Sequence, residues 1–165
     1  MQKEIVAEIG GYQKVINGAR AVLDHYRPHI SIHPDWPMEP LGNHFSTTSG
    51  GTPLTTEPTY WTGTIPWVSP KDMKSDIIYD TEDHLAEAAI ANSATKLIPA
   101  QSVICVVRSG ILKHTFPVAL LSKDMCINQD LIAFAPLTGA ISSQFLFYVL
   151  KTRSASILAE GIKPG

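Results

Sequence analysis

Length, composition and charge limit the class of protein. The chain has 165 residues, 13 Lys and Arg against 15 Asp and Glu, two Cys and a hydrophobic fraction of 44%. A chain of this size buries roughly two-thirds of its unfolded surface, so a core can form without disulfide or metal support. No window reaches the roughly 18 apolar residues that a membrane span needs, and the polar start does not resemble a signal peptide. We expect a soluble cytoplasmic protein with no membrane-bound part, in which Cys105 and Cys126 are buried thiols.

The distribution of charge qualifies the net charge of −2. DNA-binding domains are usually basic overall, so this balance argues against a nucleic-acid partner. The charges are segregated, however: residues 57–87 carry seven acids and two bases, whereas residues 88–123 carry four bases and no acid. Such a basic zone either faces DNA phosphates or is a solvated face of the domain. Its members are Lys96, Arg108, Lys113 and Lys123.

The first segment has the apolar spacing of a coiled-coil helix, alternating between four and three residues. The apolar positions are Ile5, Ile9, Tyr12, Ile16, Ala19, Leu23 and Tyr26. This seam predicts a helix over residues 1–27 that is about 40 Å long and ends before Pro28. A small domain cannot bury a seam of that length alone, so we expect a helix-partner interface. Packing along the chain's own domain is the alternative, and glycines at positions 10, 11 and 18 weaken the helix.

The remainder predicts a connector and a mixed domain. Residues 28–40 hold four prolines, which exclude a helix and interrupt strand pairing. Residues 41–165 contain short β-type runs between Gly, Pro, Asn and Asp clusters, together with helical segments. The fold class is therefore α+β: a long N-terminal helix followed by a mixed α/β domain with short twisted strands. We expect strands at 65–68, 77–79, 103–107, 118–121 and 131–134. Helices are expected at 82–92 and within 142–160, where the serine pair Ser142-Ser143 is a cap signal that marks the start.

No catalytic signature stands in the sequence. A nucleophile elbow, a phosphate-binding P-loop, a GxGxxG loop and the Asn-Pro-Pro-Tyr/Phe element of adenine methyltransferases are all missing. His25, His29 and His33 are interrupted by prolines, so a metal site is not expected. Asp35 after Pro34, with Asp72 and Lys74 downstream, superficially matches a metal-dependent nuclease, but the first part lies in the connector. We therefore expect a binding module with no catalytic residue and no metal.

Two early loops are candidate contact sites. The first loop combines small hydroxyls and glycines, which expose backbone N–H groups suited to phosphate; it consists of Ser49, Gly50, Gly51 and Thr52. In the second, Tyr60 and Trp61 precede Trp67 around a turn. These aromatic side chains are either core anchors or a surface for a partner, and the core is the better interpretation.

A third loop follows the apolar run at 103–107 and carries Arg108, Ser109, Lys113 and His114. Arginine is the commonest bidentate reader of guanine in the major groove, so Arg108 is a candidate base reader. Pairing of Arg108 with an acid in residues 72–87 is an equally good interpretation of the spacing. Phosphate contacts are expected from Lys96, Lys113, Lys123 and the first loop.

Several motifs, taken together and in order, resemble one known family. They are Ser49-Gly50-Gly51-Thr52-Pro53, Tyr60-Trp61-x-Gly63-x-Ile65-Pro66-Trp67-Val68, Lys96-Leu97-Ile98-Pro99, Arg108-Ser109-Gly110 and Asn128-Gln129-Asp130. Their order and spacing are similar to a target-recognition domain of the specificity (S) subunit of type I restriction-modification systems. The N-terminal helix and the Pro-rich connector resemble the segment that leads into such a domain, so the resemblance extends over essentially the whole chain.

The resemblance implies a non-catalytic DNA reader. The family's complete subunit has two recognition domains, each reading half of a split DNA sequence, and two long antiparallel helices that set their spacing. It docks methyltransferase (M) subunits, which methylate adenine from S-adenosylmethionine, and an ATP-driven restriction (R) subunit. The implied partners are double-stranded DNA, M and R. No cofactor is expected in this chain, since S-adenosylmethionine, ATP and Mg belong to the partner subunits.

The single recognition domain leaves two alternatives open. The chain is a half-subunit or a fragment, and two copies pairing through the N-terminal seam would then read a palindromic split target. Alternatively, it is a truncated interaction module that binds M without gripping specific DNA.

Overall fold

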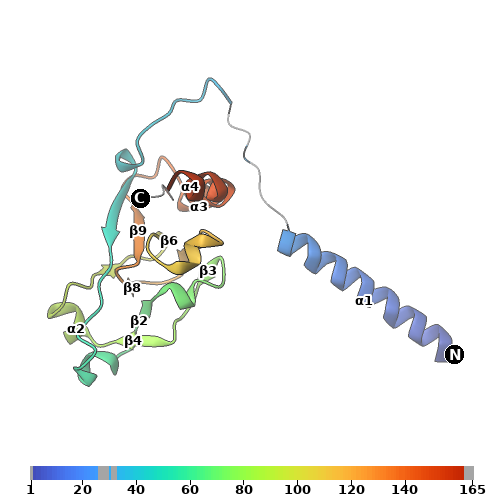
Figure 1. Cartoon of the computed structure of the whole chain (residues 1–165), viewed down its shortest axis with the longest axis horizontal. Helices are drawn as coiled ribbons and strands as arrows, with labels where there is room; N and C mark the ends of the chain where they lie inside the picture. The colour runs from blue at the N-terminus through green and yellow to red at the C-terminus, as the bar shows by residue number, and fades with distance from the viewer. Residues whose placement is uncertain (1, 26–29, 31–32, 162–165) are drawn as a thin grey trace.

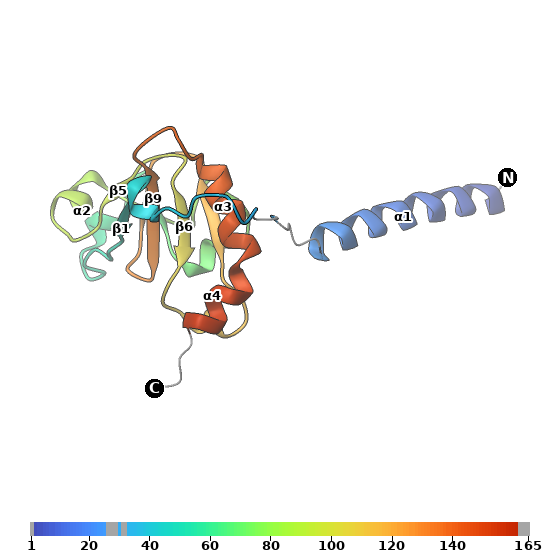
Figure 2. The same ribbon diagram turned by 90° about the horizontal axis from the view of Figure 1, so that it is seen from above.

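A computed structural model describes residues 2–25, 30 and 33–161. The N-terminal helix α1 (Gln2–His25) confirms the predicted long helix, and Figures 1 and 2 draw it away from the globular part. Described connector residues 33–40 form a turn and extended backbone rather than a regular element, as four prolines require. No helix among the described residues is long and apolar enough to cross a membrane.

Two sheets form the globular part. The five-stranded sheet has the order β1-β9-β6-β7-β3, and the four-stranded sheet has the order β4-β2-β8-β5. The strands are β1 (Phe45–Ser49), β2 (Ile65–Val68), β3 (Ile77–Ile78), β4 (Asp83–Leu85), β5 (Leu97–Ile98), β6 (Val103–Val106), β7 (Val118–Leu121), β8 (Met125–Ile127) and β9 (Leu131–Pro136). Antiparallel pairing dominates, whereas β2 with β8 and β3 with β7 are parallel.

Helices and short 3-10 turns precede, connect or follow the strands along the chain. They are α2 (Glu87–Ala91), α3 (Ser143–Thr152), α4 (Ser154–Gly161) and the short 3-10 turns η1 (Leu41–Asn43), η2 (Pro58–Trp61), η3 (Pro70–Asp72) and η4 (Gly110–Lys113). The Ser142 hydroxyl oxygen accepts a hydrogen bond from the Phe145 amide at 3.2 Å and caps α3. This bond confirms the start predicted from the serine pair, because a capping oxygen satisfies an amide that has no partner within the helix.

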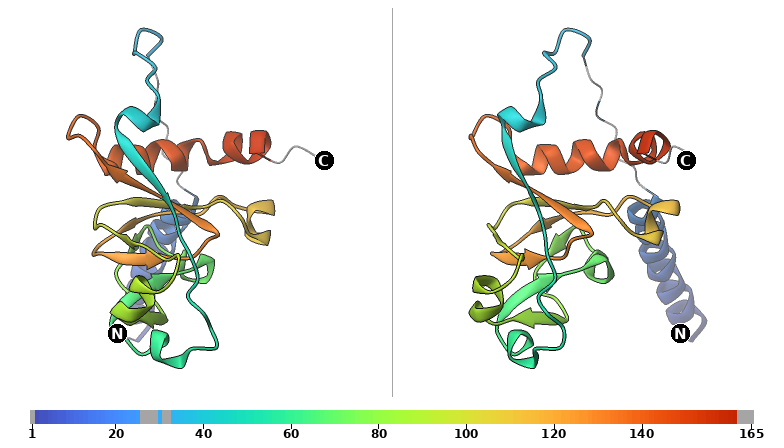
Figure 3. Two further views of the ribbon diagram at one scale, coloured as in Figure 1. Left: turned by 90° about the vertical axis from the view of Figure 1, so that its left-hand side faces the viewer. Right: turned by 60° about the vertical axis from the view of Figure 1, so that its left-hand side comes forward.

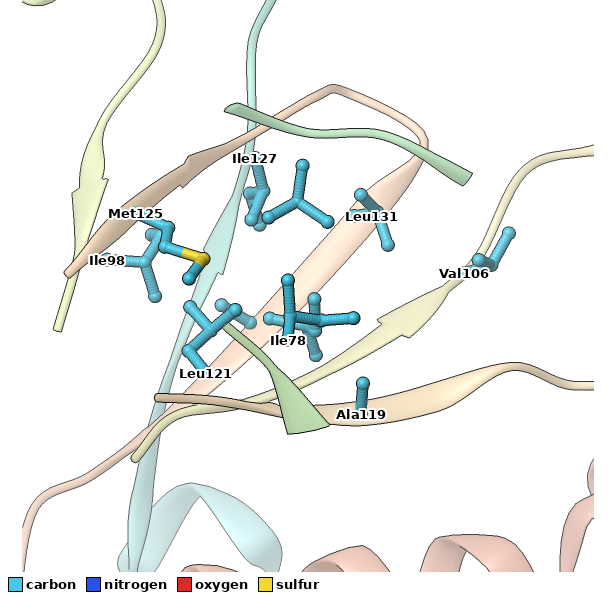
Figure 4. Close-up of a cluster of buried hydrophobic side chains, with 11 residues drawn as sticks. Ile78, Ile98, Val106, Ala119, Leu121, Met125, Ile127 and Leu131 are labelled. Atoms are coloured by element: carbon cyan, nitrogen blue, oxygen red, sulfur yellow. The ribbon is translucent and has the colours of Figure 1, made fainter. Parts of the chain in front are cut away.

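Alternation along the strands divides the core into layers. On β6, Ile104 and Val106 face the cluster between the two sheets, whereas Val103 and Cys105 face α3. Figure 4 shows the inter-sheet cluster, whose side chains come from strands of both sheets. A third cluster, around Trp67, lies on the outer face of the four-stranded sheet. The globular part is therefore α+β, as predicted.

The predicted helix at 82–92 and the predicted set of strands need correction. Residues 83–85 are strand β4, paired with β2, so the predicted helix at 82–92 shrinks to α2. A strand forms there because Ile65 pairs with Leu85 across the sheet, which overrides a local helical pattern. Three further strands were missed: β1 is polar and alternates only weakly, and β5 and β8 have two and three residues. Only their long-range partners make them strands.

Candidate nucleic-acid interface

The connection from β6 to β7, residues 107–117, forms an arm that carries four of the predicted contact residues. Its start is fixed because the amides of Val107 and Arg108 both donate to the Asp130 carbonyl, at 2.8 and 3.2 Å. Its end is fixed because the Val106 amide donates to the Pro117 carbonyl at 3.2 Å. Between these points η4 extends beyond the sheet, seen in gold in Figure 3. The arm is thus a projecting loop with an ordered root.

The side chains of the arm have distinct roles. Arg108, Lys113 and His114 are exposed, and among the described residues none of the three forms an ion pair. The predicted alternative, in which Arg108 pairs with an acid of residues 72–87, is therefore wrong for the structure as described. Ser109 is half-buried and its hydroxyl oxygen accepts from the Ile111 amide at 3.4 Å. Ser109 therefore caps η4, and three side chains remain free for a ligand.

The glycine loop after β1 is a packing element. A Cβ on Gly50 would stand 2.1 Å from the Ile127 carbonyl oxygen, and one on Gly51 would stand 2.8 Å from the carbonyl carbon of Ala94. The Gly51 amide already donates to the Ile127 carbonyl at 3.0 Å, and its carbonyl accepts from the Trp67 indole. The expectation that this loop offers free amides to phosphate is thus wrong for Gly51, which is buried.

A turn at residues 128–130 joins the glycine loop to the arm. Gln129 accepts a hydrogen bond from the Thr52 hydroxyl, while the Asp130 carbonyl holds the root of the arm. The Asn128 side-chain oxygen accepts from the Asp130 amide at 3.0 Å and stabilises the turn. The exposed Ser49 and Thr52 and the exposed Arg108 therefore stand at one edge of the domain, and this turn is their common support.

The two remaining predicted lysines differ. Lys96 is exposed just before β5, beside Thr95, and forms no ion pair with any described residue. Its neighbour Ala94 contacts Gly51, so Lys96 belongs to the same edge as the glycine loop. Lys123 instead lies 3.2 Å from Asp80 Oδ1, in the turn before β8. The assignment of Lys123 to phosphate stays a prediction, and its ion pair with Asp80 lowers the net positive charge that Lys123 offers.

Most acids of the acidic segment are paired in this way. Lys71 binds Asp83 at 2.9 Å and Glu82 at 3.2 Å, and these carboxylates raise the pKa of Lys71. A hydrogen bond from His84, followed by the one from Lys123, lowers the pKa of Asp80. Local pairing therefore neutralises much of the acidic segment and leaves the arm with uncompensated positive charge.

Tyr60 and Trp61 belong to the outer core cluster, as the preferred interpretation has it. The Trp61 ring meets the buried Trp67 ring edge-on, with centroids 5.1 Å apart, and its indole nitrogen donates to the Leu54 carbonyl at 3.3 Å. Tyr60 is half-buried against the same cluster. Both aromatic residues support the base of the glycine loop and offer little surface to a ligand.

The predicted seam of α1 is uncovered along its described length. Ile5, Ile9, Tyr12 and Ile16 are each 46–62% exposed. Ala19 is also exposed, whereas Tyr26 and the side chain of Leu23 lie outside the described part. The alternative in which the helix packs along its own domain is not seen. An apolar stripe of this kind is typical of a protein–protein contact.

A second apolar surface lies between the connector and α3. It is a groove of about 730 Å³ whose walls include Trp36, Pro37, Met38, Leu41, Phe145 and Val149. Met38 and Phe145 are 83% and 45% exposed, so the lining is open to a partner. Inside it, His44 Nε2 lies 2.6 Å from Glu39 Oε2.

The described residues bring no set of potential metal ligands together, and both thiols are buried. No cluster of three or more His, Cys, Asp or Glu side chains with metal-binding geometry occurs within the described ranges. Cys105 and Cys126 are free and buried, and burial raises the pKa of the Cys105 thiol to about 12. A thiol with so high a pKa is a poor nucleophile, because the thiolate is the reactive form.

One cation near the arm, Lys74, was not predicted as a DNA contact. Lys74 belongs to the segment after η3 and lines a small cleft whose other wall includes Ile111 and Thr115 of the arm. Lys74 lies in the acidic segment, residues 57–87, so the distribution of charge along the sequence does not mark it as a DNA contact. Only the packing of residues 73–76 against the arm places it at this surface.

Comparisons with known proteins agree with this architecture. The model of the type I restriction modification DNA specificity domain matches residues 35–163. The chain is 34% identical over 165 residues to the type I restriction enzyme EcoR124I/EcoR124II specificity subunit of Escherichia coli, covering 98% of this chain and 39% of that protein. It is 28% identical over 137 residues to the MjaIX specificity subunit of Methanocaldococcus jannaschii, covering 81% of this chain and 31% of that protein.

Solved structures show the same fold. The HsdS subunit from Thermoanaerobacter tengcongensis superimposes with a TM-score of 0.60 at 16% identity, over 99% of this chain and 43% of that one. A chain from a structure of a type I R-M system gives a TM-score of 0.58 at 17% identity, over 94% of this chain and 42% of that one. The chain thus spans about two-fifths of the length of these relatives. The family match at residues 35–163 covers the globular part, and the chain belongs to the family of type I restriction modification DNA specificity domains.

Proposed function

We propose that this chain recognises a specific DNA sequence for a type I restriction-modification complex and has no catalytic activity of its own. One observation carries the proposal: the family domain at residues 35–163 contains the edge at which the arm and the glycine loop meet. The arm projects from a rigid sheet and carries cations that are not neutralised by any described acid. A projecting loop on a fixed scaffold suits insertion of side chains into a DNA groove.

The contacts divide into two kinds. Arg108 and His114 are proposed to read base edges, since they are exposed and Arg108 is held by its backbone at the fixed root. Lys96 and Lys113, with the Ser49 and Thr52 hydroxyls, are proposed to contact phosphates. Phosphate contacts position a protein on DNA, and base contacts supply the sequence information.

The proposed protein partners are the methyltransferase (M) and restriction (R) subunits, which would supply S-adenosylmethionine, ATP and Mg chemistry in the cytoplasm. The uncovered seam of α1 and the groove beside α3 support a protein partner, because both expose large apolar side chains. Pairing of two copies through the seam is a further proposal and would give a palindromic split target. Sedimentation as a strict monomer at high concentration would remove it.

A second candidate function is a protein-interaction module that binds M without reading DNA. The same two apolar surfaces favour it, since they account for assembly without any role for the arm.

The experiment that separates the two is reconstitution of the chain with its methyltransferase subunit, followed by mapping of adenine methylation. A defined methylated sequence is expected, and complex formation without methylation would favour the interaction module. Arg108→Ala should cost about 1–3 kcal/mol at one position of the target, whereas Lys113→Ala should weaken all sequences alike. The two variants could instead change discrimination at one target position and affinity for all sequences to the same extent. That result would contradict the division between base and phosphate contacts.

A further inference from the structure

A shallow cleft of about 200 Å³ with mixed polar and apolar walls lies between the segment 73–76 and the base of the arm. One wall comes from the segment after η3, the second from the arm, and the third from α3. Its chemically relevant lining residues are Lys74, Ser75, Asp76, Thr115 and Lys151. The cleft thus collects cations and hydroxyls from three parts of the sequence that lie up to 77 positions apart.

Lys151 is held in place on one side of this cleft. Its ammonium nitrogen lies 2.6 Å from Asp76 Oδ1 and 5.1 Å from the centroid of the Phe147 ring. The side chain is 33% exposed, so much of its aliphatic stem is already packed. A cation positioned in this way loses little further rotamer freedom when it meets a ligand.

Lys74 is the free cation of the cleft. It is exposed and forms no ion pair with any residue that the structure describes. With Asp76 neutralised by one lysine, the lining keeps one uncompensated positive charge. The Thr115 hydroxyl adds a donor on the facing wall. The Ser75 hydroxyl already donates to the Ile77 carbonyl at 2.8 Å. One net positive charge with the Thr115 hydroxyl donor is chemistry suited to a singly charged phosphodiester.

We propose that this cleft binds a single backbone phosphate of DNA, with Lys74 as the direct contact and Lys151 as a cation positioned by Asp76. The inference rests on the proposed DNA-reading function and extends it to residues outside the arm. Ile111 and Thr115 of the arm form part of the cleft. A DNA strand that runs along the arm would therefore pass over Lys74. A phosphate anchored there would fix the register of the arm against the bases.

The test uses the full chain, a fluorescent double-stranded DNA of mixed sequence, and affinities measured over a series of salt concentrations. Each phosphate contact adds roughly 0.9 to the slope of log affinity against log salt, so Lys74→Ala and Lys74→Gln should each reduce the slope by about 0.9. Lys14→Ala is the matched control, since it removes one exposed lysine from α1 and should leave the slope unchanged. Lys151→Gln removes the cation that Asp76 positions and should weaken binding several-fold.

The outcomes separate the cleft from the function on which it rests. If Lys74→Ala behaves like Lys14→Ala while Lys113→Ala lowers the slope, the cleft assignment is overturned and the arm remains the DNA contact. Unchanged binding by Lys151→Gln would overturn the assignment of Lys151 to the cleft. If the unmodified chain does not bind the duplex even at low salt, both proposals fail.

Discussion

Helix α1 and the globular part use apolar residues in opposite ways. Val68 and Leu131 of the globular part are fully buried between the sheets, whereas Ile9 and Tyr12 of α1 are 60% and 62% exposed. Both segments have regular hydrophobic patterns. The strands find partners within the chain because their clusters are closed by a second sheet and by α3, while the seam of α1 finds none among the described residues. A regular apolar pattern therefore indicates that a face is to be buried, and not whether the same chain buries it.

Glycine substitutions give the largest expected contrast between the two regions. A Cβ on Gly63 would stand 2.0 Å from the Leu85 carbonyl oxygen, whereas one on Gly18 of α1 meets nothing within 4 Å. Gly63→Ala should lower the free energy of unfolding by about 4 kcal/mol or more, since backbone must move. Gly18→Ala should raise helicity, by about 1 kcal/mol of helix stability. Urea unfolding measures the free energy of unfolding of both variants, and far-UV circular dichroism measures their helicity. Equal losses of stability in Gly63→Ala and Gly18→Ala would contradict the contrast between the two regions.

Truncation of apolar side chains is the next test. Leu131→Ala should cost about 3 kcal/mol, because the side chain is fully buried in the inter-sheet cluster. Ile9→Ala should leave the unfolding free energy of the globular part unchanged and weaken only association through α1. Urea unfolding monitored by tryptophan fluorescence reports the globular part, because Trp61 and Trp67 lie in it, Trp36 lies in the adjoining connector, and α1 contains no Trp. A large loss from Ile9→Ala would mean that the seam is buried within the chain.

The cap of α3 tests a smaller local contribution. Ser142→Ala removes the acceptor for the Phe145 amide and should cost about 1 kcal/mol. Ser142→Asp, which keeps a capping oxygen, is the matched control and should retain most of the stability. Thermal unfolding of both variants measures the difference. A loss of equal size in the two variants would assign the effect to something other than the hydrogen bond.

Surface charge gives the smallest effect. Asp80 has a lowered pKa through His84 and Lys123, so its contribution to stability is present above its unfolded pKa and is lost as pH falls through the folded value. Lys123→Gln should raise the pKa of Asp80 and slightly reduce stability at neutral pH, with no difference in acid. Lys113→Gln, on the arm, should leave the pKa of Asp80 unchanged. Carbon-detected NMR titration of the Asp80 carboxyl measures both variants.

Much of the architecture could be predicted from local patterns. The heptad spacing identified α1, alternation and flanking turn residues identified β2 and β7 at their observed bounds, and the serine pair identified the start of α3. The apolar setting of Cys105 and Cys126 also predicted their burial. These features depend on neighbours within a few residues, so the sequence alone determines them.

The tertiary structure decided which polar and charged residues remain available. Lys123 and Asp80 are 43 positions apart yet share an ion pair, and Lys74 reaches the arm from the acidic segment. The Gly51 amide is taken by the end of β8, and residues 83–85 become a strand only because β2 lies beside them. The sequence by itself determined a helix with a heptad-spaced apolar stripe, a mixed α/β domain and a basic zone. Pairing between distant segments decided the rest, because hydrogen bonds and ion pairs depend on distance in space and not on distance along the chain.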